Sequence, residues 1–97
     1  MTPKEILIQA RARIDKPQKW LSYWSVSKDG KRVCAAHALR YGLLDEWEPE
    51  YLDALHRLAE ASWGLNEHWS DYDRVAYVNG GTHRDVMAMY DRAIADA

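Results

Sequence analysis

Two helix N-termini can be located in the last quarter of the chain, and they limit the folds that it can adopt. Ser70 is followed by Asp73, and Thr82 by Asp85, at the three-residue spacing of a capping box. In this motif the N-cap hydroxyl accepts a hydrogen bond from the third helical amide, and the acid at that position accepts one from the N-cap amide. A glycine pair separates the two motifs. We therefore expect two consecutive helices joined by a tight turn.

Two polar residues share the apolar faces of these helices. Asn79 falls on the face of the first helix that carries Val75, and His83 on the face of the second that carries Val86. Polar groups in an interior need hydrogen-bond partners. We expect Asn79 and His83 to point inward on either side of the turn. The remaining residues of these two faces are Tyr72, Ala76, Met89, Tyr90, Ala93 and Ile94.

The rest of the chain contains three more helical patterns and one turn signal. Thr2 and Pro3 begin a helix that ends at Asp15-Lys16-Pro17. The other two helices are expected over Cys34 to Tyr41, closed by Gly42, and from Pro49 to before Gly64. The Asp29-Gly30 pair favours a small β-hairpin near residues 23–33 or an ordered loop there. The sequence predicts a mainly α fold, a compact bundle of four to five short helices in a single domain over residues 1–97.

Charge is distributed unevenly between the two parts of the chain. The formal net charge is −2, which argues against a general polyanion binder, so direct nucleic-acid binding is not expected. Residues 1–40 contain nine Lys or Arg and three Asp or Glu. Residues 41–97 contain four Lys or Arg and twelve Asp or Glu. Such asymmetry can steer a charged partner or align two copies of the chain as a homodimer, although two oppositely charged, solvated faces would need no partner.

One cysteine rules out an internal disulfide, and no apolar run approaches the ~20 residues that span a bilayer. The first residues lack the apolar region of a signal peptide. We expect a cytoplasmic protein of a bacterial or phage-infected bacterial cell, with no membrane contact.

Aromatic residues are the unusual part of the composition: five Trp and six Tyr, but no Phe. Trp and Tyr combine an apolar body with a polar atom, which suits interfaces, although a small chain also needs large side chains for its core. Trp20 and Trp24 lie in the basic region, and Trp47 lies in an acidic loop where we expect it to be partly exposed. The residues predicted to bind a partner are Asp45, Glu46, Trp47, Glu48, Glu50, Trp20 and Trp24.

Three motifs resemble a family of small uncharacterised helical proteins found in bacteria and their phages. Members read Trp-Cys-Ala-x-Gly-Ala-Leu, then Trp-Asn-Asp with Thr-His-x-x-Val, then Asp-Arg-Ala-Ile. The matching segments here are Val33-Cys34-Ala35-Ala36-His37-Ala38-Leu39, Val78-Asn79-Gly80-Gly81-Thr82-His83-Arg84-Asp85-Val86 and Asp91-Arg92-Ala93-Ile94. Val33 and Val78 replace Trp, His37 replaces Gly, and Gly80 replaces an Asp whose loss weakens a catalytic interpretation. The resemblance implies fold and compartment but no activity.

Cys34, Asn79 and His83 could form a catalytic site or a structural one. A thiol, an imidazole and an amide that converge resemble a cysteine nucleophile with its base and orienting group. The structural alternative is a polar cluster of Cys34, Asn79, Thr82 and His83 that satisfies helix ends, and we favour it because a free Cys is often a core residue.

Metal binding is not expected. Cys34 and His37 stand three residues apart, and His56, His68 and His83 are further candidates. A structural zinc site prefers two tight ligand pairs, and the sequence offers one. We expect neither a metal nor another cofactor.

Two functions remain. The first is a non-enzymatic protein-interaction module, such as a phage-encoded inhibitor of a host defence system, whose acidic, Trp- and Tyr-rich surface docks into the basic nucleic-acid-binding groove of another protein. The alternative is a small-molecule-binding or hydrolytic protein with a site around Cys34, Asn79, Thr82 and His83. An open pocket at these four residues would favour the second function, and a closed core the first.

Overall fold

The computed structural model describes residues 1–23, 26–40, 48–63, 66 and 68–97. Its elements confirm a mainly α bundle. None of the helices within these ranges is long and apolar enough to cross a membrane. The helices are α1 (Pro3–Arg13), the short 3₁₀ helix η1 (Pro17–Lys19), α2 (Ala35–Arg40), α3 (Pro49–Ala61), α4 (Asp71–Asn79) and α5 (His83–Asp96).

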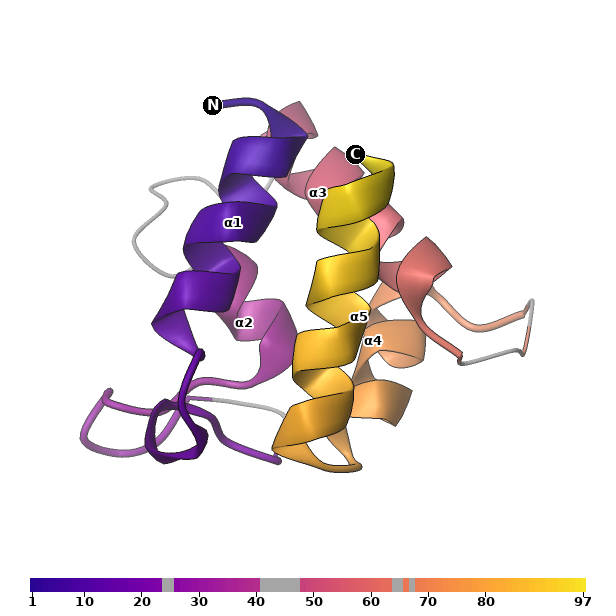
Figure 1. The fold of residues 1–97 in the computed structure, drawn as a ribbon. Coiled ribbons are helices and arrows are strands. Elements are labelled where there is room, and N and C mark those ends of the chain that lie inside the picture. The colour runs from indigo at the N-terminus through magenta and orange to yellow at the C-terminus, as the bar shows by residue number, and fades with distance from the viewer. Residues whose placement is uncertain (24–25, 41–47, 64–65, 67) are drawn as a thin grey trace.

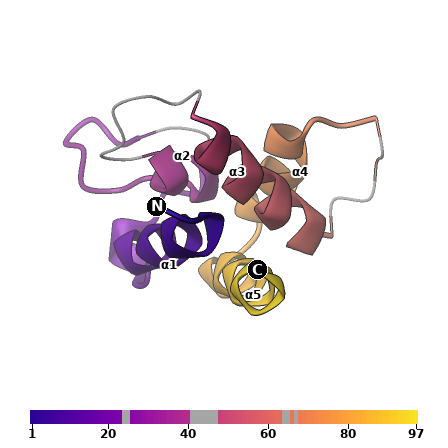
Figure 2. The same ribbon diagram turned by 90° about the horizontal axis from the view of Figure 1, so that it is seen from above.

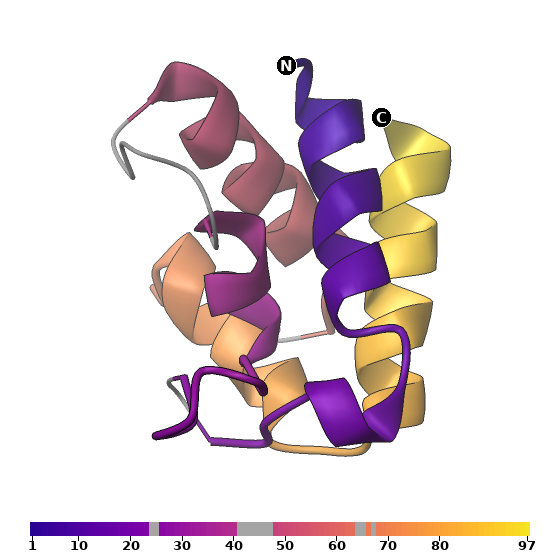
Figure 3. The same ribbon diagram turned by 90° about the vertical axis from the view of Figure 1, so that its left-hand side faces the viewer.

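The five α-helices form two layers. Seen from above, α1 and α5 lie side by side in one layer, and α2, α3 and α4 form a row behind them (Figure 2). α1 and α5 run in opposite directions, so both chain termini lie at one end of the molecule (Figure 1). The segment between α1 and α2 crosses the opposite end, next to the turn that joins α4 to α5 (Figure 3).

The core lies between these layers and is built mainly from Ala, Val, Leu and Ile side chains, together with the larger Tyr51 and Tyr90. Burying one Leu, Ile or Met contributes about 1.5–3 kcal/mol. At the exposed margin of the core, a salt bridge between Arg11 and Asp91 joins α1 to α5, with 2.6 Å between Nε and Oδ1. The largest fully buried side chains are Tyr90, Leu7, Ile14, Leu39, Leu58, Met89, Val75, Val78, Val86, Asn79 and Cys34.

Two helices begin with a complete capping box. Thr2 and Glu5 form the box of α1, and the bonds from Thr2 lower the pKa of Glu5. Thr82 and Asp85 form the box of α5, as the sequence predicted. A Cβ at Gly81 would lie 2.9 Å from Asp85 Oδ2, the atom that accepts from the Thr82 amide, so a larger residue there would have to displace this carboxylate.

The predicted box at the start of α4 is only half formed. The Ser70 side chain accepts a hydrogen bond from the Asp73 amide over 3.1 Å. The return bond from the Asp73 carboxylate is not made, and this carboxylate has no partner within the described residues.

The hairpin expected near residues 23–33 is reduced to a bridged loop. Gly30 has a φ of 73°, which is the left-handed conformation that the Asp-Gly pair predicts. Val33 forms one antiparallel bridge with Val26 and one parallel bridge with Trp20. Both bridges are isolated, and no strand is formed among the described residues of this loop.

Candidate functional site

Asn79, the last residue of α4, is a buried polar side chain with four hydrogen bonds to described residues. Its exposed fraction is 2%. Its Oδ1 accepts hydrogen bonds from the Trp20 indole over 2.7 Å and from the Ala35 amide over 2.9 Å. Its Nδ2 donates to the carbonyls of Leu21, at 3.3 Å, and Ser22, at 3.1 Å. The inward position predicted from periodicity is confirmed, and the amide fastens the loop after η1 and the start of α2 to the end of α4.

His83 performs a similar task on the other side of the turn. Its Nε2 donates to the Ile14 carbonyl over 2.7 Å, and this bond satisfies a backbone acceptor at the C-terminal end of α1. The imidazole also lies against the Trp20 indole, with 5.7 Å between ring centroids. Thr82 beside it is occupied by the α5 cap.

Cys34 lies directly before α2 and pairs with His37, not with His83, which the catalytic interpretation takes as its base. The His37 Nδ1 is 3.0 Å from the Cys34 Sγ, and the His37 amide donates to the same sulfur over 3.4 Å. The Tyr72 hydroxyl lies 3.5 Å from that Nδ1. Cys34 is fully buried, so a substrate could reach the thiol only after the surrounding structure opens.

Tyr90 completes the packing around this thiol. Its hydroxyl donates to the Ala35 carbonyl over 2.6 Å. Burial, reinforced by the neighbouring Cys34 and Tyr51, raises the pKa of Tyr90 well above its usual value. The phenol is therefore a neutral hydrogen-bond donor at neutral pH, and its position adds a second structural contact to the first turn of α2.

The four residues proposed as one site thus serve separate contacts. Asn79 binds the loop and α2, His83 binds the end of α1, Thr82 caps α5, and Cys34 pairs with His37. Helix spacing indicates which residues turn inward and places His37 within one turn of Cys34, but it does not rank this local contact above a distant one with His83.

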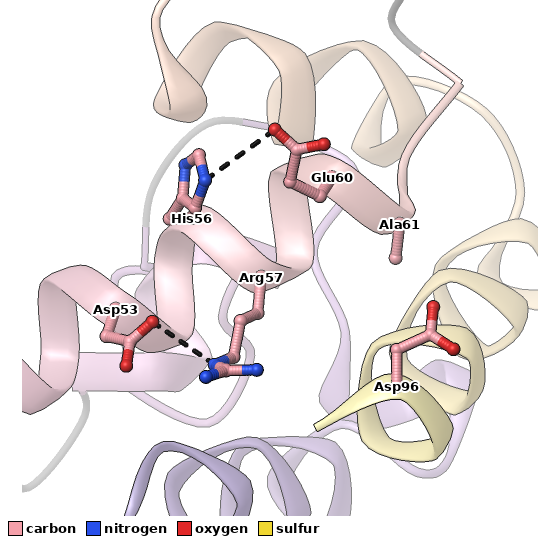
Figure 4. Close-up of a pocket in the computed structure, with 6 residues that line it drawn as sticks. All are labelled: Asp53, His56, Arg57, Glu60, Ala61 and Asp96. Atoms are coloured by element: carbon pink, nitrogen blue, oxygen red, sulfur yellow. Dashed lines mark hydrogen bonds and ion pairs between the residues drawn. The ribbon is translucent and has the colours of Figure 1, made fainter.

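An open depression of about 320 Å³ lies between α3 and the end of α5, away from these residues. Asp53, His56, Arg57 and Glu60 line it from α3, and Asp96 faces them from α5 (Figure 4). The side chains of α3 pair with one another, with 3.1 Å between Asp53 and Arg57 and 3.6 Å between His56 and Glu60. This pairing leaves few unengaged polar groups to hold a small ligand.

The histidines offer no metal centre in the described part of the chain. His56 pairs with Asp71 across the α3–α4 junction at 3.1 Å, and His68 is exposed. No group of three or more His, Cys, Asp or Glu side chains among the described residues could hold a metal ion.

The residues predicted to bind a partner have different environments. Asp45, Glu46, Trp47 and Trp24 lie outside the described residues. Glu48 and Glu50 are exposed at the start of α3. Trp20 is partly buried, packs against the core and donates to Asn79, so its main contacts are internal.

Three aromatic residues that are exposed among the described residues are not among the predicted binding residues, although Tyr23 lies in the same basic region as Trp20 and Trp24. Tyr23 is 77% exposed, Tyr77 55% and Trp69 38%. Trp69 and Tyr77 contact each other, with 5.7 Å between ring centroids. A helix whose buried face carries Val75 and Asn79 must turn Tyr77 outward, so the periodicity that located the buried face contained this signal.

Comparison with known proteins defines a family but no activity. No curated protein and no solved structure matches the chain significantly. A protein-family model described as a family of unknown function (DUF6197) matches residues 1–96, nearly the whole chain. The two-layer helical domain described above therefore belongs to the DUF6197 family.

Proposed function

We propose that this chain is a non-enzymatic protein-interaction domain. One observation carries the proposal: the polar side chains that the sequence suggested as a site are used in contacts within the chain, while aromatic side chains with unused polar atoms lie on the surface. Asn79 alone makes four hydrogen bonds and is 2% exposed. Trp69 and Tyr77, in contrast, are 38% and 55% exposed, and Trp and Tyr dominate the energetics of protein interfaces.

Charge supports a basic partner. Glu48, Glu50 and Asp53 are all exposed near the start of α3, and residues 41–97 hold twelve acids against four Lys or Arg. A basic nucleic-acid-binding groove on another protein would experience such a surface as it does a phosphate backbone. In the phage setting that the sequence resemblance implies, the partner would be a host defence protein, and this chain its inhibitor.

The hydrolytic alternative receives support from one feature, the 3.0 Å contact between Cys34 and His37. A reactive cysteine needs access to its substrate as well as a neighbouring base. Because Cys34 is fully buried, the interaction function accounts better for the arrangement.

Affinity purification from the native host, with mass spectrometry of bound proteins and small molecules, tests the proposed function. We expect a basic protein to be retained. Reversing Glu46, Glu48 and Glu50 to Lys should slow association and flatten its salt dependence, because charges at an interface margin act mainly on the encounter rate.

A variant that reverses Lys16, Lys28 and Lys31 to Glu is the matched control, since it alters as many charges in the basic part of the chain. It should retain the partner. Retention that ignores the acidic reversals, or retention of a small molecule without any protein, would contradict the proposal.

A further inference from the structure

The contact between Trp69 and Tyr77 forms an exposed aromatic pair at one side of α4. Trp69 precedes the helix, and Tyr77 lies two turns further along it. Their rings are tilted by 46° at a centroid distance of 5.7 Å. Neither the indole N–H nor the phenol O–H is used within the described residues, so both remain available to a partner.

Asp73 lies between these two residues in sequence, four positions after Trp69 and four before Tyr77. Residues four apart on a helix share a face, so its carboxylate is on the side of α4 that presents Tyr77. Asp73 is exposed, and its carboxylate makes neither the capping bond nor an ion pair with another described residue. We call Trp69, Asp73 and Tyr77 the α4 patch.

The segment of the chain that carries the α4 patch is acidic in sequence. Residues 48–79 contain seven carboxylates and two arginines. Arg74, the only arginine of α4, is directed to Glu60, 3.6 Å away. A cation that approaches the patch therefore meets the exposed carboxylate of Asp73, while the arginine of this helix is paired with Glu60.

We propose that the α4 patch binds an arginine side chain presented by an exposed segment of a partner protein. A guanidinium group stacks on aromatic rings and can also form two parallel hydrogen bonds to a carboxylate. A lysine ammonium is compact and strongly hydrated, so it gains less from the rings. The proposal rests on the proposed interaction function, because it names one contact between this chain and its protein partner.

Titration of ¹⁵N-labelled protein with a peptide of alternating Gly and Arg tests this contact. The Trp69 indole N–H signal should shift progressively, and a Gly-Lys peptide of equal length should bind roughly two- to fivefold more weakly. Binding should also weaken as salt screens the exposed Asp73.

Three variants locate the binding site. Trp69→Ala and Tyr77→Ala should each lower the affinity by roughly two- to fivefold, and Asp73→Asn should reduce both affinity and salt dependence. Asp73→Asn keeps the side-chain shape, so it shows whether the peptide binds at the α4 patch even if an aromatic variant does not fold. Tyr23→Ala is the control, because Tyr23 is 77% exposed, more than any other large apolar or aromatic side chain among the described residues, yet lies in the basic part of the chain.

Equal affinity for the two peptides, or Arg-peptide binding unchanged by the folded Trp69, Tyr77 and Asp73 variants, would overturn the inference. If the peptide does not bind while reversal of Glu46, Glu48 and Glu50 still slows partner association, this contact is wrong and the interaction function stands. If the peptide binds at the α4 patch and the native host yields no protein partner, the contact stands and the proposed function fails.

Discussion

Replacing Asn79 with Ala is the sharpest test of how this fold is held together. Asn79→Ala removes an acceptor from the Trp20 indole and the Ala35 amide, and a donor from two carbonyls of the preceding loop. The side chain is 2% exposed, so water cannot replace these bonds without entering the interior.

The expected loss can be worked out from these contacts. An unsatisfied buried polar group costs about 1–3 kcal/mol. The buried Ala35 amide bears the middle of this range, about 2 kcal/mol, and the partly buried Trp20 indole bears somewhat less than about 1 kcal/mol. With a smaller loss at the two carbonyls, the free energy of unfolding should fall by about 3 kcal/mol. A chain of 97 residues has a free energy of unfolding of about 5–15 kcal/mol. The variant should therefore fold, but the midpoint of its urea unfolding should be clearly lower.

Urea unfolding followed by tryptophan fluorescence and far-ultraviolet circular dichroism measures this loss. Asn66→Ala is a control of the same chemistry, since Asn66 bonds the His68 amide in an exposed segment. It should cost less than about 1 kcal/mol. A loss below about 1 kcal/mol for Asn79→Ala would refute the reasoning, because it would mean that these bonds are readily replaced.

The isosteric variant Asn79→Asp separates acceptor from donor. Its carboxylate still accepts from Trp20 and Ala35 but faces the carbonyls of Leu21 and Ser22 without a proton. Burial and these carbonyls should raise the pKa of the new acid. The protonated form is then favoured by folding, so this variant should lose stability as the pH rises from 4 to 7, relative to the natural chain. A parallel pH dependence in both proteins would contradict this account.

Three further predictions follow from separate contacts. Thr82→Ala should lower the free energy of unfolding by about 1 kcal/mol in the same urea assay, because the α5 cap is lost; an unchanged midpoint would deny the cap any role. The raised pKa of Tyr90 means that its neutral form stabilises the fold below pH 10 and that this stability is lost at higher pH, so the Tyr90 phenolate should appear at 295 nm only as the chain unfolds. Cys34 should react slowly with a thiol reagent in the native state and rapidly in urea; rapid labelling near neutral pH that His37→Ala suppresses would favour the hydrolytic alternative.

Local signals in the sequence were sufficient for the helix ends and for the inward position of Asn79. The α5 cap joins residues three apart, and the buried face of α4 follows a 3.6-residue period, so neither depends on the rest of the fold. The hairpin depended on more. Its turn is a local feature and is present. Val33, however, pairs with both Val26 and Trp20, and which residues pair with Val33 depends on packing over a longer segment.

The partner of Cys34 was a different kind of problem. Cys34 and His37 are three residues apart, so they meet within one helical turn and needed no tertiary contact. His83 attracted attention because it falls on an apolar face, yet its ring is directed to the end of α1, sixty-nine residues earlier in the chain. Spacing alone could not weigh a local pair against a distant one, because the position of α1 is set by the packing of the whole bundle.

The tryptophans extend this argument to function. Trp20 and Trp69 both stand just outside a helix, each with an aromatic ring as neighbour. Trp20 contacts His83, and its indole N–H donates a hydrogen bond to Asn79, so its polar atom is used within the chain. Trp69 meets Tyr77 on the surface and keeps its polar atom unused among the described contacts. Both residues are tryptophans, and they differ in whether the indole N–H has an acceptor within the chain. A Trp without such an acceptor gains most by leaving its N–H in water or by donating it to another molecule. The search for the binding surface of this domain should therefore begin at Trp69.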